Sequence, residues 1–205
     1  MSIQSLKIGF LASGAGSSAQ AVVAAIRSGA LAGEARLMVS NNKSAPALQF
    51  AREQGVPALC IPTQADPAAA DVRIAEAMAE HGVELIVMSG YLRRLGPSTV
   101  RRYARRVLNI HPGPLPAFGG EGMYGRRVHE AVLAAGVAES GIVIHQVDDQ
   151  YDHGAAVARC AVPIHPGDTA EALEARVRDA EPGFFVETLQ RLSRGEISLR
   201  QDRAS

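Results

Sequence analysis

The feature that most constrains the fold of this chain is an alternation of short apolar runs with segments of helical period. The apolar runs have strand character, and the stretches between them are Ala-rich with apolar residues at helical spacing. This alternation is typical of a parallel sheet that is covered by helices on both faces. The predicted strands of the first half are 6–12, 35–40, 57–62 and 84–90. The predicted helices between them are 18–29, 45–55 and 68–82, each ending at a glycine.

The second half of the chain is less regular. A short strand that ends at His111 leads into a Gly/Pro-rich loop of about fifteen residues, a length that is usually functional or disordered. The elements expected after this loop are helix 126–136, strand 141–149, strand 155–164, a long final helix, and a short strand in the tail. The final helix is expected to open in a capping box at Thr169, with Asp168 as a competing cap.

These elements together predict one α/β domain over residues 1–205, with a C-terminal tail from about 195 to 205. The expected architecture is doubly wound, with a mostly parallel sheet of about seven strands and helices on both faces. Ligands of such sheets bind at the carboxyl ends of the strands. We therefore expect the site at the ends of the first, fourth and fifth strands.

Composition and charge exclude several classes of partner. Lys plus Arg and Asp plus Glu both number 21, so the chain has no global basic field for nucleic acid or acidic lipid. No segment approaches the roughly 20 apolar residues that span a bilayer, and the N-terminal apolar run is too short for a signal peptide. Cys60 and Cys160 lie in apolar stretches and lack CxxC spacing, so we expect two buried thiols. A cytoplasmic protein that acts on small molecules is predicted, as a monomer or a homodimer.

A glycine-rich segment joins the first predicted strand to the first helix. The free N–H groups and the dipole of a helix N-terminus suit a phosphate, although a tight turn that needs glycine is the alternative interpretation. The dinucleotide fingerprint GxGxxG is not met, because Ala19 stands where the last glycine belongs. A monophosphate fits better than NAD. The residues concerned are Ser13, Gly14, Gly16, Ser17 and Ser18.

The string NIHPGPLP is the most specific pattern in the chain. Asn109 and His111 end a predicted strand, and the prolines after them hold the chain extended. Side chains two residues apart in a strand point the same way, so the carboxamide and the imidazole are expected side by side. Either residue alone is more often part of a satisfied core or turn. The pair, at the carboxyl end of a parallel strand, favours a ligand site.

Four motifs carry a resemblance over nearly the whole chain, roughly from Ser5 to Arg194. They are SGAGSS, NIHPGPLP, QYDHG and GDTAEALEARVRDAE. Their order and spacing resemble those of the glycinamide ribonucleotide formyltransferases, which belong to the folate-dependent formyltransferase family. The resemblance implies transfer of the formyl group of 10-formyltetrahydrofolate to the amine of glycinamide ribonucleotide, a step of purine synthesis. The implied catalytic residues are Asn109, His111 and Asp152.

Such a trio suits the chemistry of formyl transfer. An amine that attacks a formamide makes a tetrahedral carbon bearing an oxyanion, and donors aimed at that oxygen lower the barrier. Asn109 supplies a neutral donor, and a protonated His111 supplies a charged one. A carboxylate beside the imidazole favours its protonated form, and one beside the amine accepts a proton directly or through water. Asp148 and Asp149 compete with Asp152 by position alone.

The resemblance also implies two sets of binding residues. The phosphate is expected on the glycine-rich segment, with Glu181 at the glycinamide end. The pterin pocket is expected between Leu92–Leu95 and a closing loop that runs from Asp148 to Asp152. The implied acceptor-binding residues are Gly14, Gly16, Ser17, Ser18 and Glu181. The implied donor-binding residues are Leu92, Arg93, Arg94, Leu95, Asn109, Asp148, Asp149 and Asp152.

Several alternatives stay open at this point. Formyl transfer to another amine, or hydrolysis of the same folate, shares the trio but normally comes with a further domain. A non-catalytic nucleotide-binding module has no reason to keep the trio. His129 and His145 are expected to pack or to support the trio. A metal site from His111, His145 and Asp152 is conceivable by composition, but no HxH or HExxH spacing supports it and we expect no metal.

Overall fold

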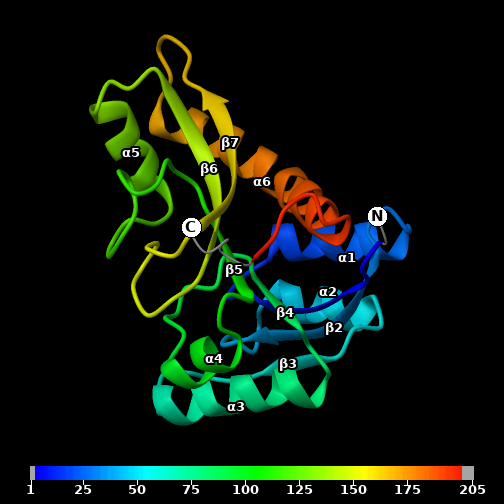
Figure 1. Ribbon diagram of the computed structural model, residues 1–205. Helices are drawn as coiled ribbons and strands as arrows, with labels where there is room; N and C mark the ends of the chain where they lie inside the picture. The colour runs from blue at the N-terminus through cyan, green and yellow to red at the C-terminus, as the bar shows by residue number, and fades with distance from the viewer. Residues whose placement is uncertain (1–2, 200–205) are drawn as a thin grey trace, which may run out of the picture.

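The computed structural model describes residues 3–199, which form one seven-stranded sheet with helices on both faces (Figure 1). The order of strands across the sheet is β3-β2-β1-β4-β5-β6-β7. The strands are β1 (Leu6–Leu11), β2 (Gly33–Ser40), β3 (Ala58–Cys60), β4 (Leu85–Met88), β5 (Val107–His111), β6 (Glu139–Gln146) and β7 (Ala156–Pro163). The predicted mostly parallel, doubly wound α/β fold is confirmed.

One strand of the sheet, β6, runs opposite to the other six. The strands from β3 to β5 pair in parallel, whereas β6 is antiparallel to both β5 and β7. The chain first builds β1, β2 and β3 outward and then returns to add β4 on the other side of β1. The crevice between β1 and β4 is therefore the point where open α/β sheets bind ligands.

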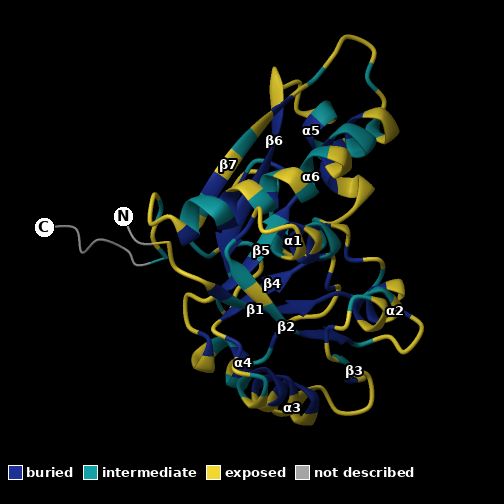
Figure 2. Ribbon diagram, turned by 90° about the vertical axis from the view of Figure 1, so that its right-hand side faces the viewer, coloured by how far each residue is buried: buried dark blue, intermediate teal, exposed yellow. Residues whose placement is uncertain are grey.

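The helices divide between the two faces of the sheet. On one face α1 (Ser17–Arg27), α2 (Pro46–Glu53) and the C-terminal part of α6 (Ala170–Ser193) share one apolar cluster. On the other face α3 (Pro67–Glu80) and α4 (Pro97–Arg102) share a second cluster. The helix α5 (Arg126–Ala134) packs with the first half of α6 against β6 and β7. Figure 2 shows the buried strands enclosed between these layers.

The central strand β1 shows why the core is two-sided. Ile8 and Phe10 are fully buried in the cluster of α1, whereas Leu11 is fully buried in the cluster of α3. Between them, Gly9 lets α3 approach closely, because a Cβ at this position would lie 2.4 Å from the Met78 sulfur. Residues that alternate in this way belong to a strand covered on both faces.

Three sequence predictions need correction. Residues 195–199 form turns and bends and no strand, and the rest of the predicted tail lies outside the described residues. Cys60 and Cys160 are half-buried, because they lie on β3 and β7, the two edge strands of the sheet. Thr169 does cap α6 by accepting the Ala172 N–H at 3.2 Å, but an alanine at this third helical position leaves the capping box without its reciprocal bond.

The short helix α4 is absent from the predicted elements, because six residues are too few to show a helical period. Its N-terminus is capped from a distance by the buried side chain of Asp71 on α3. The carboxylate accepts the backbone N–H groups of Gly96, Ser98 and Thr99 at 3.1, 2.7 and 3.2 Å. This cap fixes the segment between β4 and α4. No helix within residues 3–199 is long and apolar enough to cross a membrane.

We expect Asp71→Ala to lower the free energy of unfolding by about 2–3 kcal/mol, because one buried and two partly buried N–H groups lose their carboxylate acceptor. Urea denaturation followed by circular dichroism measures this change. The matched control is Asp66→Ala, which removes the exposed cap of α3 and should lose only about 1 kcal/mol. Equal losses in the two variants would contradict a special role for Asp71.

Candidate active site

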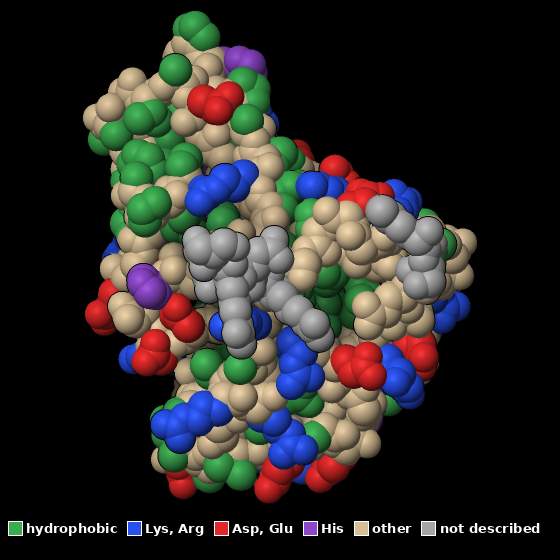
Figure 3. Space-filling model, viewed as in Figure 1, with side chains coloured by type: hydrophobic (Ala, Val, Ile, Leu, Met, Phe, Trp, Pro, Cys, Tyr) green, Lys and Arg blue, Asp and Glu red, His purple; other side chains and the backbone are tan. Residues whose placement is uncertain are grey.

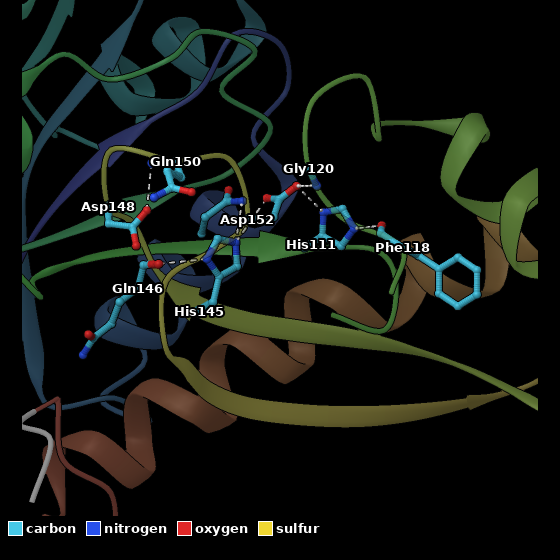
Figure 4. Close-up of polar contacts among 9 residues, drawn as sticks. His111, Phe118, Gly120, His145, Gln146, Asp148, Gln150 and Asp152 are labelled. Carbon is cyan, nitrogen blue, oxygen red and sulfur yellow. Dashed lines mark hydrogen bonds and ion pairs between the residues drawn. The ribbon is translucent and has the colours of Figure 1, made fainter. Parts of the chain in front are cut away.

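Four polar side chains converge at the carboxyl end of β5. Asn109 and His111 come from β5, His145 comes from β6, and Asp152 comes from residues 147–154, here called the 147–154 loop (Figure 4). Asn109 and His145 are direct partners in the antiparallel pairing of β5 with β6. We call these four residues the site cluster.

The distances within the site cluster are short. Asn109 Nδ2 lies 3.1 Å from His145 Nε2, and Asp152 lies 3.4 Å from both imidazoles through its two oxygens. The predicted trio is thus brought together, with His145 between Asn109 and Asp152. His111 and His145 are 3% and 2% exposed, which removes most competing water.

Hydrogen bonds to backbone carbonyls orient both rings. His111 Nε2 donates to Phe118 O at 2.7 Å, and His145 Nδ1 donates to Gln146 O at 2.9 Å. A carbonyl only accepts, so these two nitrogens carry protons. His111 Nδ1 therefore faces the Asp152 carboxylate, and it carries a proton only when the ring is charged.

For both His111 and Asp152, burial and the neighbouring charges shift the pKa in opposite directions. Burial lowers the pKa of His111 below its ordinary value, while the Asp152 carboxylate and the Phe118 carbonyl raise it in part. Burial would raise the pKa of Asp152, but the hydrogen bond from His145, the His111 charge and the Gly120 N–H hold it below its usual range. Asp152 is thus ionised and is the carboxylate that stabilises a charged imidazole.

The backbone at Asp152 is in the left-handed region, with φ of 52°. A non-glycine residue rarely takes this conformation, and it persists only where surrounding contacts hold it. Asp152 Oδ2 accepts the Gly120 N–H at 3.1 Å, and a Cβ at Gly119 would lie 3.0 Å from the Asp152 Cβ. The Gly-rich loop before α5 therefore packs directly on Asp152.

The neighbouring acids point elsewhere. Asp148 pairs with His153 at 2.8 Å and accepts the Gln150 N–H at 2.9 Å, both within the 147–154 loop. Asp149 is exposed, and its carbonyl accepts a hydrogen bond from Arg94. Of the three candidate carboxylates, Asp152 is the one that contacts the imidazoles of His111 and His145.

The glycine-rich segment meets the expectation for a helix N-terminus without a side-chain cap. Gly16 precedes α1 with φ of 65° and supplies no side-chain cap. The Ala19 N–H donates to Ser89 Oγ at 3.2 Å, whereas the N–H groups of Ser17 and Ser18 have no intrahelical partner. The hydroxyl of Ser18 is fully buried and has no partner among residues 3–199. Ser17 and Ser18 are the first two residues of the helix. These groups together suit an anion.

A hydroxyl ties this segment to the end of β4. Ser13 Oγ donates to Asn41 Oδ1 at 2.6 Å and accepts the Leu92 N–H at 2.9 Å. Its backbone N–H donates to Gly90 O at 3.1 Å. The neighbouring Gly14 accepts the Ala47 N–H through its carbonyl. The predicted phosphate and pterin segments are therefore in direct contact.

The residues of the predicted pterin segment, 92–95, differ in exposure. Leu92 is 71% exposed and Leu95 is 6% exposed, while Arg93 and Arg94 are both exposed. Arg94 also lies over the Tyr151 ring, 5.7 Å from its centroid. Residues 92–95, here called the donor segment, thus contact the 147–154 loop.

Glu181 lies apart from these contacts, on α6 beside the internal Pro182. Burial raises the pKa of Glu181 to about 7, and Arg178 offsets part of this rise. No hydrogen bond or ion pair joins Glu181 to the site cluster within residues 3–199. Within the same residues, no group of three or more His, Cys, Asp and Glu side chains is arranged to hold a metal ion.

The sequence predicts that His145 packs or supports the trio, but it does not identify the partners of this residue. His145 contacts two of the three predicted catalytic side chains, whereas the sequence alone leaves it as a packing or supporting residue. The signal that could have found it is the register of β6 against β5. His129 is also buried, and its Nδ1 has no partner among the described residues.

The chain matches the family model described as Formyl transferase over residues 6–189. It is 34% identical over 204 residues to the chloroplastic phosphoribosylglycinamide formyltransferase of Vigna unguiculata, covering 98% of this chain and 65% of that protein. It is 31% identical to the phosphoribosylglycinamide formyltransferase of Haemophilus influenzae, covering 97% of this chain and 92% of that protein.

A solved structure agrees with these sequence matches. The crystal structure of glycinamide ribonucleotide transformylase 1 from Symbiobacterium toebii superposes with a TM-score of 0.87 at 32% identity. The superposition covers 96% of this chain and 92% of that one. Sequence and fold therefore agree with the resemblance carried by the four motifs.

We expect Asp152→Asn to lower the pKa of His111, because the variant removes the negative charge that raises it while leaving the ring buried. An NMR titration of the His111 ring proton measures this, with the resonance assigned by its loss in His111→Asn. The titration midpoint of His111 should move to lower pH. A midpoint that stays or rises would contradict the arrangement.

Proposed function

Because the chain belongs to the formyl transferase family, we propose that it transfers the formyl group of 10-formyltetrahydrofolate to the amine of glycinamide ribonucleotide. The products are the formylglycinamide ribonucleotide and tetrahydrofolate. The observation that carries the proposal is that Asp152 contacts His111 directly and Asn109 through His145, at the carboxyl edge of the sheet. The N-terminus of α1 lacks a side-chain cap and lies at the same edge of the sheet, where the Ala19 N–H donates to the hydroxyl of Ser89, just after β4.

The reaction has one bond to form and one to break. The acceptor amine attacks the formyl carbon to give a tetrahedral intermediate, and the bond to the folate nitrogen then breaks. The attacking nitrogen loses a proton and the departing nitrogen gains one, so no net acid or base is consumed. Direct transfer in a ternary complex suits this site, because no serine or cysteine in it has the base that would make it a nucleophile.

Asn109 and His111 are the proposed donors to the oxyanion. The Asn109 amide has two N–H groups, and only one of them is needed for the contact with His145. The His111 Nδ1 to Asp152 distance of 3.4 Å is longer than a normal hydrogen bond. A charged His111 is stabilised by the carboxylate, and its Nδ1–H, which faces Asp152 at this longer distance, is the proposed donor to the developing oxyanion.

Asp152 has the second role of accepting the amine proton. It is ionised, it lies beside both imidazoles, and one of its oxygens is already oriented by Gly120. A carboxylate with a lowered pKa is a weak base, so its first contribution is the field that favours the protonated form of His111 against the effect of burial. The proton leaves the amine either directly to Asp152 or through water.

The two substrates take opposite sides of this cluster. The phosphate of the ribonucleotide binds the first-turn N–H groups of α1 with the Ser18 hydroxyl, and Glu181 accepts an N–H of the glycinamide. The pterin of the folate lies between the donor segment and the 147–154 loop. The Ser13 hydroxyl contacts Asn41 and Leu92 and thereby joins the proposed phosphate site to the donor segment.

The deciding assay offers 10-formyltetrahydrofolate with glycinamide ribonucleotide, and then with water alone, and follows loss of the formyl group from the folate. Transfer only in the presence of the ribonucleotide supports the proposal. Release of formate in water at the same rate would assign the chain to hydrolysis instead. Transfer to a different amine, with none to the ribonucleotide, would overturn the choice of acceptor.

We expect Asp152→Asn to lower kcat by about 10²–10³ with near-normal substrate affinity, because the charge that supports His111 is lost while size is kept. Asp66→Asn is the control, since asparagine caps α3 as well as aspartate does. The double variant Asn109→Ala/Asp152→Asn should lose little more than Asp152→Asn, because groups that act as a unit are not additive. Steady-state kinetics would contradict the assignment if Asp152→Asn kept most of its turnover.

Acceptor affinity should depend on the charge of Glu181. Its pKa is raised to about 7 in the free protein, so lowering the pH through this value protonates the carboxyl and removes an acceptor of N–H bonds. We expect the KM for glycinamide ribonucleotide to rise as pH falls from about 8 to about 6. In Glu181→Gln the KM should be high throughout this range and flat. A KM that falls with falling pH would show that Glu181 does not meet the acceptor.

A further inference from the structure

The 147–154 loop has a fixed base. Gln146 N donates to Ala155 O at 2.9 Å, which closes the loop where it leaves and rejoins the sheet. A Cβ at Gly154 would lie 1.9 Å from Gln146 O, so the two ends of the loop pack backbone to backbone. The outer residues Asp149, Gln150 and Tyr151 are all exposed. Their position therefore depends on contacts made at the surface.

Two of the three sets of side-chain contacts in this loop do not fix its outer residues. Asp152 is bonded inward, to the two imidazoles and to Gly120. Asp148 is bonded to His153 and to the Gln150 N–H, both in the same loop. Neither set joins the outer residues to another part of the chain.

Arg94 supplies the third set. Its guanidinium donates to the carbonyl of Asp149 and lies 5.7 Å from the centroid of the Tyr151 ring. A planar guanidinium makes such a pair of contacts at once, because it donates in its plane and stacks through its face. Within residues 3–199, these are the contacts that join the outer residues of the loop to the donor segment.

The segment that carries Arg94 is itself firmly held. The Leu92 N–H is bound by Ser13, Leu95 is buried, and the Gly96 N–H is bound by Asp71. Arg94 therefore projects from a fixed backbone toward a loop that is less constrained. Its guanidinium joins the donor segment to the 147–154 loop.

Charge favours the same contact. Residues 93–106 contain six arginines and no acid, whereas the 147–154 loop contains three aspartates. Figure 3 shows basic side chains over α4. Above them lie acidic and histidine side chains, at the position that the 147–154 loop has in Figure 1. The attraction between these opposite charges favours the approach of the loop to the donor segment, and the contacts of Arg94 fix the position of the loop there.

We propose that Arg94 is a positioning residue that holds the 147–154 loop against the donor segment, so that the folate site is preformed and Asp152 is kept in its left-handed conformation. The inference rests on the proposed function, because that function makes the loop and the donor segment the two walls of one site. Arg94 acts through the loop and does not touch the reacting atoms.

The direct test is hydrogen exchange of the free protein, followed by mass spectrometry on peptides that cover residues 147–154. Arg94→Met keeps the length of the side chain and removes both contacts, so exchange in this loop should be faster by roughly tenfold. Arg101→Met is the matched control, because Arg101 is exposed and has no side-chain partner among residues 3–199. The control should exchange like the wild type. Equal exchange in Arg94→Met and the wild type would overturn the proposal.

Steady-state kinetics adds a readout that a general folding defect would not give. In Arg94→Met the KM for 10-formyltetrahydrofolate should rise by roughly tenfold, while the KM for glycinamide ribonucleotide should stay unchanged. Arg94→Lys keeps the cation but not the fork, so it should recover part of the loss. A rise in both KM values, or no rescue by lysine, would argue against a role in holding the loop.

A double-mutant cycle isolates the contact itself. Tyr151→Ala should raise the KM for the folate as well, and adding it to Arg94→Met should have little further effect, because the two side chains act through one contact. Fully additive losses would contradict this. If the wild type transferred no formyl group at all, the proposed function would fail, but the exchange measurement would still decide whether Arg94 holds the loop.

Discussion

The structure depends most on one carboxylate that is partly buried between two imidazoles. Asp152 contacts His111 and His145 at 3.4 Å on either side, and its backbone is held in a conformation that a non-glycine residue rarely adopts. An ionised carboxylate in such a place is stable only with charged or hydrogen-bonding partners. Both histidines and the Gly120 N–H supply them, and Gly119 packs closely on the Asp152 side chain. The Gly-rich loop before α5 and the strand pairing of β5 with β6 therefore serve the same group.

The change of strand direction at β5 is what makes this arrangement available. Because β6 runs antiparallel, its last residues lie beside the first residues of β5, with His145 paired to Asn109 and Gln146 to Leu108. The loop that follows β6 begins beside Val107, whose carbonyl accepts the Val147 N–H. It then carries Asp152 back to the end of β5, where its carboxylate reaches His111. The topology thus brings residues 109–111 and 145–152 together from a single hairpin-like pairing.

Much of the fold could be predicted from the sequence because local patterns determine it. Apolar runs, helical spacing and the left-handed glycines Gly29, Gly55 and Gly82 mark the elements of the first half, and the structure has helices that end at each of these. The pair Asn109 and His111 was predictable for the same reason, since both lie in one strand. The half-buried state of the cysteines was not, because it depends on which strands end up at the edges.

The missed features share a cause, which is that they depend on register or on contacts between distant segments. Helix α4 is too short for a period and is defined by Asp71, 25 residues before Gly96. The role of His145 depends on its pairing partner in β5, and the tie from Arg94 to Tyr151 joins two loops. No local pattern encodes such pairings. The choice of Asp152 rather than Asp148 or Asp149 was predicted from the family resemblance and not from spacing.

The site cluster also has a consequence for its protons. Two imidazoles share one carboxylate, and the charge of His145 lowers the pKa of His111, so charging both rings is unfavourable. One negative carboxylate balances one imidazolium, and the cluster is then close to neutral overall. A further proton, such as the one released by an attacking amine, meets a carboxylate with one neutral imidazole beside it. Taking up that proton would give the cluster one net positive charge in a buried site, so in the proposed reaction the proton is passed on to water or to the departing folate nitrogen.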